Sequence, residues 1–244
     1  MRIAIFSDVH ANLVALDAVL EDIQRQAVDQ MVCLGDVAAS GPQPHDTIQR
    51  LLSLQAPVVM GNADAWLLEP NPYSGENELY LRVSEIDRWC ASQLTTEDLN
   101  FIRSFQARIK VPFLNEGTLL CYHGSPHKNT DIITAGMPDE DLEPLLSGFQ
   151  TLVMAGGHTH VQMLRRYRGS ILINPGSVGL GYEVDVSGDA NHNVPWAEYA
   201  ILDRVAGSLS LNFRRVPLDL DLLRQAALQG DMPHAVWWAG EWRA

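Results

Sequence analysis

The chain has 244 residues, of which 46% are hydrophobic and 19% are charged, a composition typical of a soluble globular protein. Its formal net charge of −13 argues against stable nucleic-acid binding, because proteins of that class carry an excess of Lys and Arg. No apolar stretch approaches the roughly 18 residues that a membrane span requires, and the three cysteines form no CxxC pair. We therefore expect a cytoplasmic protein, away from membranes, with a single domain over residues 1–244.

The first sixty residues alternate between predicted strands and helices. Three short apolar runs are typical of buried strands, at residues 2–6, 31–34 and 57–60. A helix is predicted after Asn12, which is a suitable N-cap, and another begins near Pro44, a residue suited to a first helical turn. This alternation predicts a parallel α/β arrangement for the first part of the chain.

The pattern then changes, and residues 64–107 are predicted to form a helical insertion. Two helices are expected there, and the second opens where Thr95 can cap together with Asp98 three residues later. No linker rich in Gly or Ser borders this segment, so it is not predicted to be an independent domain.

The second half of the chain is rich in predicted strands. They cover residues 109–113, 118–122, 151–155, 161–167, 170–173, 198–202 and 208–215. The runs 161–167 and 170–173 form a predicted hairpin, and residues 218–228 a predicted helix. The tail carries three tryptophans, which we expect to pack onto the body of the protein because so large an apolar side chain is usually buried in part.

Residues of metal-ligating type follow predicted strands at several points in the chain. They are Asp8 and His10 in FSDVH, Asp36 in CLGDV, Asn62 in MGNAD, His123 in CYHGS, and His158 and His160 in GGHTH, with Asp64 beside Asn62. Each motif alone is weak evidence, because isolated Asp-x-His or His-x-His pairs occur incidentally in loops. The ordered set, with its members at the ends of separate strands, predicts one site where those ends converge.

Carboxylate, imidazole and amide donors are those from which proteins build two-metal centres. Two divalent ions about 3.5–4 Å apart supply an activated water and neutralise charge on a transferring phosphoryl group. We expect two divalent ions per chain, with Mn favoured and Fe, Zn, Ni or Co as alternatives, since such mixed donors accept all of them.

The ordered motifs DVH, GDVAASGP, GNAD, HG and GHTH resemble those of the calcineurin-like metallophosphoesterase superfamily. They look closest to its small bacterial and archaeal phosphodiesterase-like members, and NPGSVG at 174–179 and RVPLD near residue 215 are similar as well. The resemblance implies an α/β fold, a four-layer α/β/β/α sandwich of two mixed sheets flanked by helices, with the metals at one end.

The same resemblance implies roles for individual residues. Asp8, His10, Asp36 and His160 would hold the first ion, and Asp36 would bridge to a second ion completed by Asn62, His123 and His158. The implied reaction is hydrolysis of a small phosphorylated substrate by a hydroxide that bridges the ions, more readily on phosphodiesters than on monoesters. Asp36, Asn62 and His123 would hold the hydroxide and the phosphate.

One position departs from the family pattern. Many members carry a histidine after GN that acts as general acid, and this chain has Ala63 there. General acid catalysis is typically worth ~10²–10⁴-fold in rate. Asp64, His127 and His192 are candidate replacements for the proton donor. For Asp64 the alternative is a supporting or capping role beside Asn62, and for the two histidines an exposed place in a loop.

Two other functions are weighed against the phosphodiesterase. A serine/threonine protein phosphatase-like monoesterase would share the metal motifs, but those enzymes generally keep the histidine that Ala63 replaces. A catalytically weak metal-dependent binding protein would also account for Ala63. The complete ligand set argues against it, because unpaired carboxylates and histidines cost stability without a metal.

Overall fold

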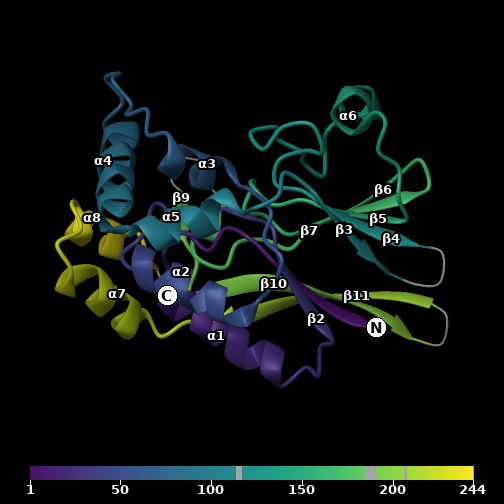
Figure 1. Cartoon of the computed structure of the whole chain (residues 1–244), viewed down its shortest axis with the longest axis horizontal. Helices are drawn as coiled ribbons and strands as arrows, with labels where there is room; N and C mark the ends of the chain where they lie inside the picture. Colours follow the sequence, from purple (N-terminus) through teal and green to yellow (C-terminus); the bar gives the residue numbers. More distant parts are fainter. Residues whose placement is uncertain (114–116, 185–190, 206–207, 244) are drawn as a thin grey trace.

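The computed structural model describes residues 1–113, 117–184, 191–205 and 208–243. Two β-sheets lie face to face, and helices cover their outer faces (Figure 1). The predicted sandwich of two mixed sheets flanked by helices is therefore confirmed.

The first sheet combines strands from the N-terminal and the C-terminal parts of the chain. Its order is β11-β10-β1-β2, with β1 parallel to β2 and antiparallel to β10. The strands are β1 (Arg2–Phe6), β2 (Gln30–Cys33), β10 (Trp196–Val205) and β11 (Ser208–Pro217). The predicted strands at 198–202 and 208–215 are confirmed within longer ones.

The second sheet has the order β3-β4-β5-β7-β6, with β4, β5 and β7 parallel and an antiparallel strand at each edge. Its strands are β3 (Ile109–Pro112), β4 (Thr118–Cys121), β5 (Val153–Ala155), β6 (Met163–Tyr167) and β7 (Ser170–Asn174). The predicted hairpin is confirmed as β6 and β7.

One predicted strand and one predicted loop need correction. Residues 57–60 form only isolated bridges, Cys33 with Val58 and Val59 with Gln106, because Pro57 has no N–H to donate and the chain turns at Gly61. The segment predicted as a loop before residue 196 contains a small sheet of β8 (Tyr182–Val184) and β9 (Asn191–Asn193). Residues 185–190 of that predicted loop lie outside the described residues.

Alternating side chains along the strands build three layers of core. Ile3 and Ile5 of β1 point between the sheets, whereas Ala4 and Phe6 point toward the helices. The helices on that side include α1 (Leu13–Gln24), α2 (Pro44–Leu54) and α7 (Leu220–Gln229). The other outer face is covered by α6 (Asp139–Leu146), which the sequence did not predict because it is short and contains Pro144. The three cysteines are buried and free.

The segment predicted as a helical insertion forms three helices, one more than expected. It contains α3 (Asn62–Leu68), α4 (Glu78–Gln93) and α5 (Thr96–Arg103), and Thr95 and Asp98 form the predicted capping box. The tail forms α8 (Ala235–Gly240), and Trp238 and Trp242 are buried against the body as expected. No helix among the described residues has the length and apolar character needed to cross a membrane.

A partly buried ion pair fastens α1 to the first sheet. Asp22 of α1 accepts hydrogen bonds from Arg214 Nε of β11 at 2.7 Å and from the Tyr199 hydroxyl of β10 at 2.6 Å. Burial acts to raise the pKa of Asp22, but these hydrogen bonds outweigh burial and lower it. The Asp22 carboxylate therefore stabilises the fold at pH values above its unfolded-state pKa. This contribution is lost as the pH falls through its folded-state pKa.

We expect Asp22→Asn to lower the free energy of unfolding at pH 7 by about 1.5–3 kcal/mol, the range for hydrogen bonds to a charged group. Urea unfolding of the variant and of the wild type measures this difference, which should shrink below pH 4. Asp17→Asn on the same helix is the control, because Asp17 pairs with Arg50 at the exposed surface and such pairs contribute about 0–1 kcal/mol. An Asp22 variant as stable as the control would contradict the prediction.

Candidate metal centre

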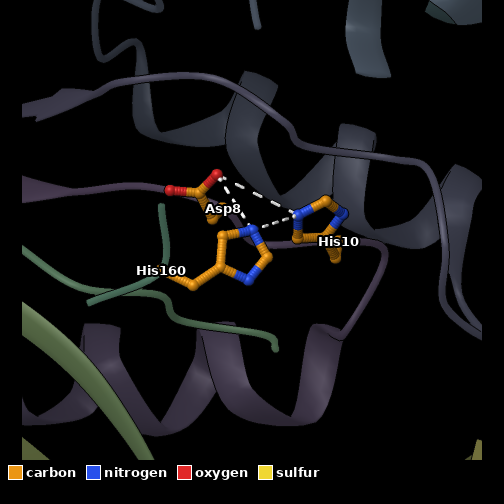
Figure 2. Close-up of side chains that lie close together, drawn as sticks. All are labelled: Asp8, His10 and His160. Carbon is orange, nitrogen blue, oxygen red and sulfur yellow. Dashed lines mark hydrogen bonds and ion pairs between the residues drawn. The ribbon is translucent and has the colours of Figure 1, made fainter. Parts of the chain in front are cut away.

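The predicted ligand residues gather at one end of the two sheets. Asp8 and His10 follow β1, Asp36 follows β2, His123 follows β4, His158 and His160 follow β5, and Asn62 begins α3. They form two groups in which the candidate ligand atoms lie within 4.8 Å of one another, Asp8 with His10 and His160, and Asp36 with His123 and His158. Figure 2 shows the side chains of the first group directed toward one another.

The two aspartates lie between the groups and connect them. Asp8 Oδ1 is 3.4 Å from His160 Nε2, 4.0 Å from His10 Nε2 and 3.9 Å from His123 Nε2. Asp36 Oδ2 is 3.2 Å from His123 Nε2 and 3.9 Å from His10 Nε2. Each carboxylate is thus within reach of histidines from both groups, and the two groups form one continuous centre.

Asn62 adds a neutral oxygen to this centre. Its Oδ1 lies 3.1 Å from His123 Nε2, at the first position of α3. The structure therefore brings all seven predicted ligand residues together, two carboxylates, one amide and four imidazoles.

Backbone carbonyls fix the orientation of three of the histidines. The Nδ1 atoms of His123 and His160 lie 2.8 Å from Leu34 O and Leu180 O, and His10 Nδ1 lies 3.3 Å from Ala39 O. A carbonyl oxygen only accepts, so Nδ1 carries the proton and donates it. Nε2 of each neutral ring is then left with a lone pair directed into the centre, as in histidines that ligate metals.

The loops that carry the ligands have strained backbones. Asp8, His10, Asp36, His158 and His160 all have φ between 50° and 69°, in the left-handed region. Residues other than glycine rarely adopt this conformation, and the strain persists only where the surrounding structure imposes it. Five of the seven predicted ligands are therefore held in a backbone conformation that serves the site at a cost to local stability.

Asp64 fixes the loop that carries Asp36. Its Oδ2 accepts hydrogen bonds from Asp36 N at 2.8 Å and Gly61 N at 3.0 Å, and its Oδ1 accepts one from Val37 N at 2.8 Å. Its side chain is fully buried. Burial and the neighbouring Asp36 charge raise the pKa of Asp64 to about 7, against the effect of these hydrogen bonds. The contacts are those of a residue that positions Asp36 and Gly61.

The NPGS segment positions the other loops of the centre. Asn174 Nδ2 donates to Gly157 O at 2.6 Å and to Thr159 Oγ1 at 3.0 Å, within the GHTH loop. Ser177 Oγ donates to Asp8 O at 2.8 Å. The link between Asn174 and the histidine loop had no sequence signal beyond the place of Asn174 at the end of a predicted strand.

The charges within the centre are balanced among its own residues. Burial and the neighbouring His160 lower the pKa of His10 to about 4, so this ring is neutral at pH 7. Burial acts to lower the pKa of His123, but the charges of Asp36 and Asp8 outweigh it and raise it to about 10. Without a cation, His123 therefore holds a proton that neutralises Asp36, and metal binding would have to release it.

The residues fit a pair of divalent ions. Asp8 Oδ1 is buried and accepts no hydrogen bond from any described residue. The Nε2 atoms of His10 and His160 lie only 3.1 Å apart although both Nδ1 atoms are engaged by carbonyls. A buried oxygen without a hydrogen-bond donor and two ring nitrogens this close together are unfavourable unless a proton or a metal cation lies among them. The structure thus has two groups of aspartate and histidine that could each hold a metal ion.

Two of the candidate proton donors lie outside both ligand groups. His127 Nε2 is 2.9 Å from Ser147 O, at the end of α6, and its ring packs against Phe149. His192 lies in β9, opposite Glu183 of β8. Among the contacts of the described residues, neither ring is hydrogen-bonded to a predicted metal ligand.

A sandwich of two mixed sheets with an aspartate and histidine centre at the strand ends is the architecture of a metal-dependent phosphoesterase. The model of the calcineurin-like phosphoesterase superfamily domain matches residues 1–189, and the chain belongs to this superfamily. Members of the family use divalent metal ions, as the two groups at this centre would require.

Individual relatives extend the similarity over the whole chain. A metallophosphoesterase from Sphaerobacter thermophilus has a similar crystal structure, with a TM-score of 0.75, 28% identity, and 99% of this chain and 98% of that one covered. A hypothetical protein from Pyrococcus horikoshii OT3 shares the fold, with a TM-score of 0.77, 17% identity, and 96% and 95% coverage. An uncharacterised protein of Methanocaldococcus jannaschii is 25% identical over 98% of this chain and 96% of its own length.

Proposed function

We propose that this protein is a phosphodiesterase that uses two divalent metal ions. The observation that carries the proposal is the position of Asp8 and Asp36, each within 4.0 Å of histidine nitrogens from both ligand groups. Such carboxylates can serve two ions at once. When bound, the ions would activate a water molecule and neutralise charge on the phosphoryl oxygens.

The chain's own residues would hold and shape this centre. Asp8, His10, Asp36 and His160 would hold one ion, and Asp36, Asn62, His123 and His158 the other. The carbonyls of Leu34, Ala39 and Leu180 keep three of the imidazoles in the required tautomer. Asp64 and Asn174 keep the ligand loops in place, so that little reorganisation is needed when substrate binds.

One feature favours diesters over monoesters as substrates, and a second favours esters with activated leaving groups. A monoester dianion carries one more negative charge than a diester, and the cavity beside His158 and His160 has no Lys or Arg among its described lining residues to receive it. Ala63 also removes the usual proton donor, which matters least for esters whose leaving group needs no protonation. Activated diesters of small molecules are therefore the proposed substrate class, and Mn²⁺ is the proposed ion, with Fe, Zn, Ni and Co as accepted alternatives.

We expect the protein to hydrolyse bis(p-nitrophenyl) phosphate faster than p-nitrophenyl phosphate when Mn²⁺ is restored after chelation. Release of p-nitrophenolate, followed at 0 and 2 equivalents of Mn²⁺ per chain, measures both rates. Faster turnover of the monoester would favour the phosphatase alternative. No turnover of either ester by a protein that binds two ions would favour a metal-dependent binding protein.

A further inference from the structure

A large apolar cavity adjoins the metal centre. It has a volume of about 480 Å³, within the range of sites for small organic ligands. Its walls come from the segment before α6, from the start of β6 and from Tyr182 of β8. His158 and His160 line it directly, so the cavity opens onto the predicted metal ligands.

The lining offers apolar surface and few free polar groups. Ile132, Val161 and Tyr182 line the cavity with 57%, 48% and 38% of their surface exposed, although large apolar side chains are usually buried more completely. No Asp, Glu, Lys or Arg is among the described lining residues.

Three of the polar groups that line the cavity are already hydrogen-bonded within the protein. Gln162 Nε2 donates to the carbonyls of Pro175 and Arg214, both at 3.2 Å. Thr159 Oγ1 accepts from Asn174, and the carbonyl of Thr134 accepts from Arg165. A hydroxyl-rich group placed in the cavity would therefore regain only part of the hydrogen bonds that it loses to water, whereas an apolar group would gain from burial.

We propose that this cavity binds an uncharged, apolar organic group of the phosphodiester, and that Ile132 and Tyr182 help to determine this specificity. The inference rests on the proposed function, because His158 and His160 belong to both the cavity and the metal centre. A phosphate at the metals would place its ester substituent at the mouth of the cavity. The preferred substrates are then diesters of hydrophobic alcohols.

A series of alkyl p-nitrophenyl phosphates tests this proposal, because the leaving group and its pKa stay constant while the retained alkyl group grows. We expect kcat/KM in Mn²⁺ to rise roughly fourfold per buried methylene, or on the order of 60-fold from the methyl to the butyl ester. The 3-hydroxypropyl ester has the same chain length as the butyl ester, but its kcat/KM should be close to that of a much shorter alkyl ester. Equal kcat/KM values along the series would overturn the proposal.

Two variants connect this preference to the cavity. Ile132→Ser should reduce the ratio of butyl to methyl kcat/KM by roughly fivefold, since part of the apolar wall is lost. Leu164→Ser is the matched control, because Leu164 is similarly exposed, 52% against 57% for Ile132, and does not line the cavity. An unchanged ratio in Ile132→Ser, or an equal fall in Leu164→Ser, would contradict the assignment.

Binding of alkylphosphonates separates failure of this inference from failure of the proposed function. If no ester of the series is hydrolysed, the proposed phosphodiesterase activity is wrong, and calorimetry with the Mn²⁺-loaded protein decides the question of the cavity. Butylphosphonate should bind more tightly than methylphosphonate by at least tenfold, and Ile132→Ser should diminish the difference. Equal affinities, or no binding of butylphosphonate, would overturn the inference.

Discussion

Asp36→Asn is expected to abolish metal-dependent hydrolysis while the protein remains folded. Asp36 Oδ2 lies 3.2 Å from His123 Nε2 and 3.9 Å from His10 Nε2, between the two ligand groups. Its Oδ1 accepts a hydrogen bond from Ala63 N at 2.8 Å, which an asparagine oxygen can retain. The amide nitrogen would then take the place of Oδ2, and it can neither ligate a cation nor supply negative charge.

The loss of activity should be at least about 10³-fold, the upper range for removing one preorganised electrostatic contact. Metal analysis after dialysis should find two ions per chain in the wild type and fewer in the variant. Thermal melting of both proteins after chelation checks that the variant is folded. Asp46→Asn makes the same charge change at an exposed position of α2 and should keep full activity. Activity of the Asp36 variant within tenfold of the wild type would contradict the two-metal assignment.

The general architecture was accessible from the sequence because it follows from local patterns. In β1, Ile3 and Ile5 alternate with Ala4 and Phe6, and both sets are apolar, which is the signature of a strand covered on both faces. Ligand-type residues directly after such strands had to lie at one end of the sheet. The resemblance to a known family then supplied the pairing of strands into two sheets, which no local pattern contains.

What the sequence could not reveal depends on contacts between distant segments. An alanine Cβ at Gly61 would lie 2.1 Å from Asp36 Oδ1, so this glycine is required by a side chain 25 positions earlier in the chain. The apolar lining of the cavity includes Ile132, Val161 and Tyr182, whose exposure becomes unusual only once the fold places them beside the histidines. Asp64 was recognisable as a neighbour of Asn62, but its three backbone contacts were not.

Asp64→Asn is expected to destabilise the protein and to weaken metal binding, even though the substitution changes only one atom. The two oxygens of Asp64 accept three backbone hydrogen bonds, from Asp36, Val37 and Gly61. An asparagine must direct its NH₂ group at one or two of these N–H donors, which leaves them unsatisfied in a fully buried place. Each unsatisfied group costs about 1–3 kcal/mol, so we expect a loss of about 2–4 kcal/mol in unfolding free energy.

The kinetics of the same variant distinguish a positioning role from that of the proton donor. Asp64 has a pKa raised to about 7 by burial and by Asp36, so a protonated form exists near neutral pH. If Asp64 donated a proton, its loss would slow esters with basic leaving groups far more than p-nitrophenyl esters. Its contacts instead imply misplacement of Asp36, a ligand needed for every substrate. Comparing phenyl and p-nitrophenyl esters of the same retained group should therefore give equal fractional losses, and a loss that grows with leaving-group pKa would assign the proton to Asp64.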